Sequence, residues 1–177
     1  LSGQCNMALA GGASVTLPQS GYDHDPSLMF AADGHCRPFD AAANGAVPGN
    51  GAALVLLKPL AAALADGDPV VAVIAAGAVN NDGGGKVDFY APSQAGQEAV
   101  LREALAMAGL EPQAIGHVEA HGTGTPLGDP IEVAALDAIY RTDRVAPGSI
   151  ALGAVKGNIG HLHTASGVAG LVKASMM

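Results

Sequence analysis

Two histidines follow predicted strands at the positions where a parallel α/β sheet gathers its functional groups. His121 comes directly after a strand predicted over residues 115–120, and His161 follows a second one predicted over residues 150–155. If these strands are neighbours in a parallel sheet, both imidazoles lie at the same edge. Two imidazoles there could donate hydrogen bonds to a developing oxyanion, or act as acid and base near neutral pH. On position alone, they could equally be loop histidines without a catalytic role.

Further polar side chains lie beside these histidines in the sequence. Lys156 follows the second strand and could orient a histidine or bind a carboxylate, although a solvated strand end is the commoner role for a single lysine. The hydroxyls of Thr123 and Thr125 could bind a polar chain in a narrow passage. Asp129 and Glu132 could cap a helix and pair with a basic neighbour, and for these two acids a structural role is favoured over a catalytic one.

Other chemistries are less well supported by the residue spacing. Residues 122–128 contain three glycines, but they lack the GxxxxGK[ST] order of a phosphate loop, and no GxGxxG motif opens a helix after a first strand. His161 and His163 form an HxH pair that could bind zinc together with His121. Nothing nearby supplies an acidic second shell for such a metal, so we expect no metal site.

The two cysteines and the remaining histidines give weaker indications of a catalytic role. Cys5 precedes a predicted buried strand, and Cys36 lies in a loop between a histidine and an arginine. Basic neighbours can lower the pKa of a thiol, so Cys36 is not excluded as a nucleophile, but a loop thiol without a role is the favoured interpretation. His24 and His117 are interpreted as surface residues.

Hydrophobic patterns and turn residues predict the elements that position these groups. The pattern predicts buried strands over residues 7–17 (interrupted by two glycines), 51–57, 70–79, 115–120 and 150–155. It predicts helices over residues 59–65, 93–107, 129–141 and 164–177, with long irregular connections over 18–50 and 80–92 and a helix end at 1–4. From residue 70 onward, strands and helices alternate. This order predicts a parallel sheet with right-handed crossovers.

Composition restricts the class of protein. The chain has 177 residues, of which 49% are hydrophobic and 14% charged, so it can build a core and is not disordered. A net charge of −8 argues against sequence-independent binding to nucleic acid or to anionic membranes. No apolar run reaches the 18 residues of a membrane span, no secretory signal opens the sequence, and two cysteines cannot form a disulfide scaffold. We therefore expect part of a soluble, cytoplasmic enzyme.

Several motifs resemble those of β-ketoacyl synthases. Residues 118–132 read VEAHGTGTPLGDPIE and are similar to the VEAHGTGTxLGDPIE signature of that family, while residues 156–161, KGNIGH, resemble its KxNIGH motif. Residues 165–173 resemble the helix that follows. The stretches 33–40 (DGHCRPFD), 80–83 (NNDG) and 91–93 with Gln97 are similar to ketosynthase domains of modular type I polyketide synthases. The likeness extends over essentially the whole chain.

The resemblance implies an α/β, thiolase-like fold, in which two similar halves stack as five αβαβα layers. On that template the fold is incomplete. Residues 1–60 correspond to the end of the N-terminal half, and residues 61–177 to the C-terminal half truncated before its last strands.

The resemblance also implies the chemistry. Ketosynthases catalyse a decarboxylative Claisen condensation, in which an acyl thioester on a cysteine is attacked by the carbanion of a malonyl-type extender. By resemblance, His121 and His161 are catalytic and stabilise the enolate oxygen. Lys156 supports the second histidine, Thr123 and Thr125 bind phosphopantetheine, and structural support comes from Asp129, Glu132 and Asn158.

The same resemblance implies partners and cellular setting. No cofactor is bound directly, because substrates arrive on the phosphopantetheine of an acyl carrier protein. Other polyketide synthase domains, and a second copy in a homodimer, are the further expected partners, in the cytoplasm and without nucleic acid or membrane.

One departure from the family concerns the nucleophile. It should lie in a segment resembling DTACSSS upstream of residue 1, and Cys5 aligns instead with a cysteine outside the active site. We therefore expect a fragment that is inactive alone, from a domain that elongates chains because both histidines are retained. Two smaller departures are Gly157, where serine is commoner in the family, and His163, where the family often has glutamine or glutamate. The alternatives are a non-elongating acyl-transfer module, a structural or scaffold module, a thiolase-type enzyme and a zinc hydrolase.

Overall fold

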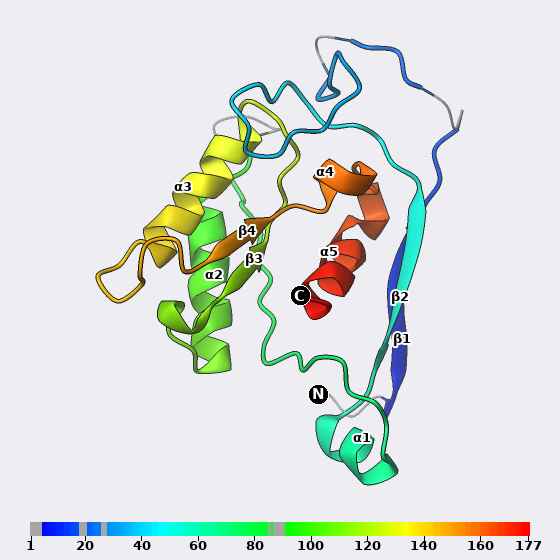
Figure 1. The fold of residues 1–177 in the computed structure, drawn as a ribbon, viewed down its shortest axis with the longest axis vertical. Coiled ribbons are helices and arrows are strands. Elements are labelled where there is room, and N and C mark those ends of the chain that lie inside the picture. Colours follow the sequence, from blue (N-terminus) through cyan, green and yellow to red (C-terminus); the bar gives the residue numbers. More distant parts are fainter. Residues whose placement is uncertain (1–4, 18–20, 26–27, 85, 87–90) are drawn as a thin grey trace.

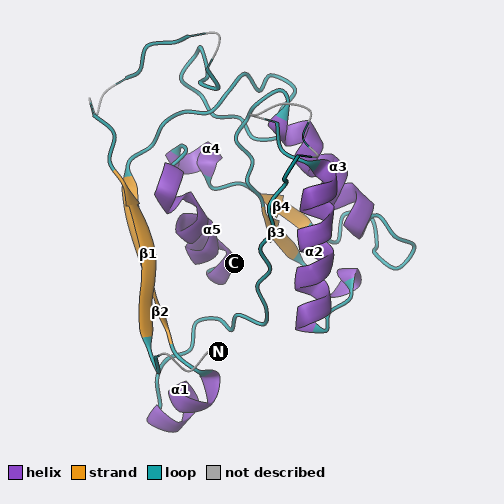
Figure 2. Cartoon of the chain, turned by 180° about the vertical axis from the view of Figure 1, so that it is seen from behind, coloured by secondary structure: helices purple, strands orange, loops and turns teal. Residues whose placement is uncertain are grey.

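The computed structural model describes residues 5–17, 21–25, 28–84, 86 and 91–177, and arranges their elements in layers (Figure 1). Helix α5 (Ser166–Ser175) lies between two pairs of strands. The antiparallel pair β1 (Ala8–Ser14) and β2 (Gly51–Leu57) is on one side, and the parallel pair β3 (His117–Glu119) and β4 (Ala151–Gly153) is on the other. Helices α2 (Gln94–Ala108) and α3 (Gly128–Tyr140) form the outer layer next to β3 and β4 (Figure 2).

The β1–β2 pair is covered on one face only. Along both strands, half-buried residues alternate with exposed ones, and Leu9 lies opposite Leu56 on the open face. The inner face contacts the turn before α5, where the hydroxyl of Thr164 donates a hydrogen bond to the carbonyl oxygen of Ala13 at 2.7 Å. The prediction of two buried strands was therefore right in position and wrong in burial, and the two glycines lie inside β1 instead of interrupting it.

The strand predicted over residues 70–79 is wrong. These residues form no strand, and their large side chains are exposed, with Val79 at 92%. A β-strand needs a neighbour to accept and donate its backbone hydrogen bonds, and no strand among the described residues pairs with this segment. β-Branched residues alone do not supply that partner.

Helix ends follow the predicted capping chemistry. The side chain of Ser93 accepts a hydrogen bond from the amide of Gly96 at 3.1 Å and caps α2, which ends at Gly109 in the left-handed conformation (φ 65°). The short helix α1 (Leu60–Asp66) likewise ends at Gly67 with φ 71°. Both predicted helices are confirmed within two residues.

A crossover through α3 connects the parallel strands. After a 3₁₀ turn η1 (Pro112–Ala114), β3 leads through α3 to β4, and His117 and Glu119 lie opposite Ala151 and Gly153. Between β4 and the last predicted helix, the chain forms one further turn of helix, α4 (Lys156–Ile159). A second 3₁₀ turn, η2 (His163–Ala165), precedes α5, so the predicted last helix is split into two.

The core is small and consists largely of alanine. Its buried hydrophobic residues are Ala31, Ala46, Ala63, Ala91, Ala135, Ile139, Leu162 and Ala165. Small side chains let the layers approach closely, and many larger apolar side chains remain exposed on the strands and helices.

The connections predicted to be irregular are irregular wherever the structure describes them. The predicted helix end over residues 1–4 and parts of the connections 18–50 and 80–92 lie outside the described residues. Within the described residues, no helix has both the length and the apolar character needed to cross a lipid bilayer.

Candidate active site

The two histidines meet beyond the carboxyl ends of β3 and β4. The ring centroids of His121 and His161 are 5.7 Å apart, and the planes meet edge to face at 86°. The topology predicted this approach, because parallel neighbouring strands bring their carboxyl ends to one edge. The arrangement leaves two imidazoles close enough to act on the same substrate group.

The long connection between β1 and β2 holds the backbone of His161. The amide of His161 donates to the carbonyl oxygen of Val47 at 2.7 Å, and its carbonyl oxygen accepts from the amide of Gly49 at 3.0 Å. Gly160 lies just before this bridge with φ 76°, and a Cβ atom there would be 2.8 Å from the Val47 oxygen. A glycine is therefore needed for the loop to approach His161 this closely.

Hydrogen bonds to one ring nitrogen determine the tautomer of His161. Its Nδ1 lies 3.0 Å from the backbone nitrogen of His163 and 3.0 Å from Oγ of Ser166. Because a backbone amide can only donate, Nδ1 is the acceptor, and the proton of the neutral ring is on Nε2. Burial, then the positive charge of Lys156, then His121 and His163 lower the pKa of His161 to about 4.

Glu132 fixes the backbone at His121. Its two carboxylate oxygens accept hydrogen bonds from the amides of His121, at 2.6 Å, and Gly122, at 2.8 Å. The prediction of a basic neighbour for Glu132 was wrong at the level of direct contacts, since backbone amides take that place. The carboxylate, carried by α3, thereby positions the loop that bears His121.

Lys156 contacts the first histidine. Its ammonium group donates to the carbonyl oxygen of His121 at 2.6 Å and lies 3.5 Å from Nδ1 of the same ring, while the residue is only 4% exposed. The resemblance implies that Lys156 supports the second histidine, His161. Its hydrogen bonds go to His121, and its charge acts on the ring of His161 as well.

Burial and like charge shift the pKa values of Lys156 and His121. Burial is the main cause that lowers the pKa of Lys156. His121 is exposed, yet the atoms packed around its ring lower the pKa of His121 by desolvation, and the nearby ammonium lowers it further. Both effects favour a neutral imidazole at position 121.

Asp129 joins two loops at the buried side of the site. The residue is 4% exposed, and its oxygens accept hydrogen bonds from the amides of Phe39, at 2.7 Å, and Gly124, at 3.1 Å. Phe39 has φ 64°, an uncommon backbone conformation for a bulky residue. The predicted basic partner is again replaced by amides. Asn158, expected to support the site, lies exposed on α4, and its side chain forms no hydrogen bond within the described part of the chain.

The two threonines hydrogen-bond to each other. The hydroxyl oxygens of Thr123 and Thr125 are 3.0 Å apart, and that of Thr125 also accepts from the amide of Gly128, at 3.2 Å, in the first turn of α3. Thr123 is 7% exposed. Each hydroxyl keeps capacity for at least one more hydrogen bond.

A buried ion pair near the site was not anticipated from the sequence. Glu119, with a side chain 6% exposed, accepts hydrogen bonds from the amide of Val155 and from Nζ of Lys173 at 2.7 Å. Burial raises the pKa of Glu119, but Lys173 and the Val155 amide outweigh it, so that the net shift is downward. An acid in an apolar strand and a lysine in an apolar helix were the available signals.

His117 is not a surface residue. Both of its ring nitrogens are buried and have no hydrogen-bond partner among the described residues. Its Nε2 lies 3.6 Å from the carboxylate of Glu119, beyond hydrogen-bonding distance.

Neither cysteine is placed as an activated thiol. Cys36 is half-buried, and its sulfur lies 3.4 Å from the carbonyl oxygen of Thr123. Burial is the main cause that raises the pKa of Cys36, so the thiolate is disfavoured. Cys5 is exposed.

The three histidines do not converge as zinc ligands. The ring of His163 stacks on that of His161, with centroids 5.0 Å apart and planes at 24°, and Nδ1 of His161 already accepts hydrogen bonds. Tetrahedral coordination requires ligand atoms that point at one centre. In the described ranges, no group of three or more histidine, cysteine or acidic side chains is placed to hold a metal.

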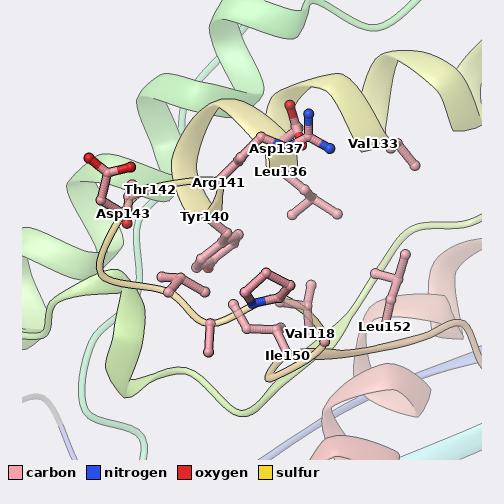
Figure 3. Close-up of a pocket in the computed structure, with 14 residues that line it drawn as sticks. Val118, Val133, Leu136, Asp137, Tyr140, Arg141, Thr142, Asp143, Ile150 and Leu152 are labelled. Atoms are coloured by element: carbon pink, nitrogen blue, oxygen red, sulfur yellow. The ribbon is translucent and has the colours of Figure 1, made fainter.

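A separate open pocket lies between α3 and the β3–β4 pair (Figure 3). It has a volume of about 810 Å³, and its walls include Val118, Leu136, Tyr140 and Leu152. None of the predicted site residues lines it. The candidate chemistry is therefore at the ends of the strands and not in this pocket.

Comparisons with known proteins agree with the fold and the motifs. The family model described as beta-ketoacyl synthase, C-terminal domain, matches residues 71–177, and the one described as beta-ketoacyl synthase, N-terminal domain, matches residues 1–63. The division at residue 60 stays a prediction.

Similar sequences occur in polyketide synthases. The chain is 52% identical to a phenolphthiocerol/phthiocerol polyketide synthase of Mycobacterium tuberculosis, over 98% of this chain and 12% of that protein. It is 44% identical to polyketide synthase PksN of Bacillus subtilis, over 99% of this chain and 3% of that protein. The chain thus spans a small part of the relatives it matches.

Solved structures confirm the predicted fold class. Ketosynthase twelve of the bacillaene polyketide synthase from Bacillus amyloliquefaciens superposes with a TM-score of 0.93 at 47% identity, over 99% of this chain and 31% of that chain. The ketosynthase from module 1 of the same organism's bacillaene synthase gives 0.91 at 46% identity, over 99% and 31%. The described elements are therefore part of a thiolase-like α/β fold. With both halves matched by family models, the chain belongs to the β-ketoacyl synthase family.

Proposed function

We propose that this chain forms the enolate-stabilising part of a ketosynthase domain, an acyltransferase of polyketide synthesis. The reaction is decarboxylative Claisen condensation of an acyl thioester with a malonyl-type extender on an acyl carrier protein. One observation carries the proposal. His121 and His161 meet at 5.7 Å, each with hydrogen-bonding groups at Nδ1, so that their Nε2 atoms are left for substrate.

The two imidazoles suit an enolate oxygen. Loss of carbon dioxide from a malonyl thioester leaves negative charge on the thioester oxygen. Neutral imidazoles held in place donate Nε2–H hydrogen bonds to that oxygen without reorganising as the charge develops. The lowered pKa values of His121 and His161 support this, because both rings remain neutral under ordinary conditions.

Lys156 supplies the next element of the proposal. Its ammonium group lies beside Nδ1 of His121 and donates only, which favours the tautomer with the proton on Nε2. Its positive charge also stabilises negative charge that develops nearby, and its burial at 4% exposure strengthens the interaction. We assign to Lys156 the positioning of His121 and, through its charge, the electrostatics of both histidines.

The nucleophile is proposed to come from residues outside this sequence. Condensation needs a cysteine thiolate to carry the growing acyl chain, and the thiol of Cys36 has a raised pKa and a carbonyl partner. We therefore propose that these 177 residues do not condense substrates alone. The chain spans 31% of the solved ketosynthase chains, which is consistent with a division of catalytic residues between segments.

Substrate delivery completes the proposal. We assign binding of the phosphopantetheine arm to Thr123 and Thr125, whose hydroxyls retain hydrogen-bonding capacity at the loop that carries His121. The acyl carrier protein, neighbouring polyketide synthase domains and a second ketosynthase copy are the proposed partners. The proposed location is the cytoplasm.

Carbon dioxide release from malonyl carrier protein tests the proposal in the intact ketosynthase domain. His121→Ala and His161→Ala should each lower release by about 10²–10³-fold, the usual effect of removing one donor from an oxyanion site. His24→Gln, at an exposed histidine, is the matched control and should release carbon dioxide at the unchanged rate. Release that survives both alanine variants would overturn the assignment, and none from the unaltered domain would favour a non-elongating module.

A further inference from the structure

His163 lies against the face of His161. The two ring centroids are 5.0 Å apart and the planes are within 24° of parallel, so the rings stack. His163 is exposed, whereas His161 is half-buried. The enolate chemistry proposed above gives no task to His163, although this side chain makes the closest ring contact with a proposed catalytic residue.

The backbone of His163 is arranged toward the same ring. Its φ angle of 45° is in the left-handed region, which few residues other than glycine adopt. In this conformation its amide lies 3.0 Å from Nδ1 of His161 and donates to it. Its amide and its ring therefore both hold His161, one from the edge and the other from the face.

Among the residues that the structure describes, the charged groups that act on His161 are all basic. Lys156 approaches from α4, His121 from the end of β3 and His163 from η2, while α5 contributes the uncharged hydroxyl of Ser166. Burial is the largest cause that lowers the pKa of His161, followed by Lys156, His121 and His163 in that order. Of the three, only His163 is stacked directly on the ring.

We propose that His163 is a positioning residue that keeps His161 in its neutral, hydrogen-bond-donating form when the surroundings become acidic. The inference rests on the proposed function and adds to it a group that sets the acid limit of the reaction. A proton added to the stacked pair is better solvated on the exposed ring than on the half-buried one. Once His163 is charged, a second proton on His161 meets like charge at close range.

Protonation of His161 has a further cost at Nδ1. A proton there would point at the amide of His163 and displace the hydrogen bond that this amide donates. Both the charge of the His163 ring and the position of its amide therefore oppose the same event. The outcome is a site whose donor at Nε2 persists at a pH where an isolated histidine would have lost its neutral form.

The test uses the intact ketosynthase domain labelled with ¹³C at the histidine rings, with His161 assigned through His161→Gln. His163→Asn removes the charge and tolerates φ 45°, because asparagine is one of the few residues found there. His163→Lys keeps a positive charge without the stacked ring. His24→Gln, at an exposed histidine of the long connection, is the matched control.

We expect the midpoint of the His161 titration to move upward by about half a pH unit or more in His163→Asn. The acid limb of carbon dioxide release should move in the same direction. In His163→Lys, the midpoint of the His161 titration should stay close to that of the unaltered domain. In His24→Gln, the midpoint should equal that of the unaltered domain. A merely structural role of His163 would lower activity in both variants without separating their pH profiles.

Equal His161 midpoints in the unaltered domain and in His163→Asn would overturn the proposal, as would an equal upward shift in His163→Lys. If His163→Asn does not fold, His163→Gly meets the same backbone requirement and gives the same comparison. The ring titration does not depend on turnover. If the His161 midpoint moves upward in His163→Asn but the domain releases no carbon dioxide, the coupling between the two rings is supported and only the proposed function is contradicted.

Discussion

The ammonium group of Lys156 donates a hydrogen bond to the carbonyl oxygen of His121 over 2.6 Å, and it lies 3.5 Å from Nδ1 of the same residue. A single buried cation thus holds the backbone and the ring of one proposed catalytic histidine. Because Lys156 also begins α4, which leads to His161, it links the two histidines through the chain as well as through its charge.

Replacing this lysine should impair His121 more than the fold. In Lys156→Met, the carbonyl oxygen of His121 loses its donor, and carbon dioxide release should fall by about 10²–10³-fold. The pKa of His121 should rise, because the like charge beside its ring is gone. Both are measured in the intact domain, by release from malonyl carrier protein and by ring titration of His121.

Lys58→Met is the control for that experiment. Lys58 pairs with Asp66 and Asp68 around α1, at the opposite end of the molecule from α4 (Figure 1). This variant should release carbon dioxide at the unaltered rate. An undiminished rate in Lys156→Met would remove Lys156 from the site.

The ion pair between Glu119 and Lys173 should stabilise the fold. Glu119→Gln leaves the partly exposed ammonium group of Lys173 without its charged partner and should lower the free energy of unfolding by about 1–3 kcal/mol. Glu119→Gln combined with Lys173→Met should recover part of that loss. Urea denaturation of the intact domain measures both, and a double variant no more stable than the single one would contradict the pairing.

The same pair predicts how stability depends on pH. The folded pKa of Glu119 is below its ordinary value, so its contribution is present above the unfolded pKa and is lost as the pH falls through the folded pKa. The unaltered domain should therefore lose more stability than Glu119→Gln on acidification below the ordinary glutamate range. Parallel stability curves for the two proteins would show that Glu119 does not contribute in this way.

Asp129 should hold the connection at Phe39 against the loop at Gly124. Asp129→Asn replaces one accepting oxygen with an amide that cannot accept, which should cost about 1–3 kcal/mol in the free energy of unfolding. Amide hydrogen exchange at Phe39 and Gly124 should become faster, while exchange at His161, held by Val47, should not change. Unchanged protection at both amides would show that Asp129 does not hold these two segments together.

Local chemistry and topology explain what the sequence predicted well. Ser93 and Gly109 mark the ends of α2 because capping depends on residues within a few positions. The meeting of His121 with His161 follows from two parallel strands and needs no knowledge of side-chain packing.

What the sequence did not predict depends on contacts between distant segments. Glu119 and Lys173 are 54 positions apart in the sequence. The partners of Asp129 and Glu132 are backbone amides, and residue types in the sequence do not indicate which amide will be a partner. Residues 70–79 have strand-like composition, but pairing is decided by a neighbour that composition does not reveal. The same holds for Lys156, whose burial next to His121 exists only once both strands are in place.

Gly160 should be required for the position of His161 and not only for its own backbone angle. In Gly160→Ala, the new methyl group would be 2.8 Å from the carbonyl oxygen of Val47, which accepts the amide of His161 at 2.7 Å. The hydrogen bond between His161 and Val47 must then open and let His161 move. Carbon dioxide release should fall by at least about tenfold, because even a small displacement of a catalytic group lowers the rate. Gly148→Ala is the matched control, since Gly148 has a similar φ of 74° with no atom within 4 Å of the added carbon. Gly148→Ala should lose about 1–2 kcal/mol of stability to its backbone angle and Gly160→Ala at least as much, because it also clashes with Val47, but only Gly160→Ala should lose activity. Equal rates in the two variants would show that the contact with Val47 does not position His161.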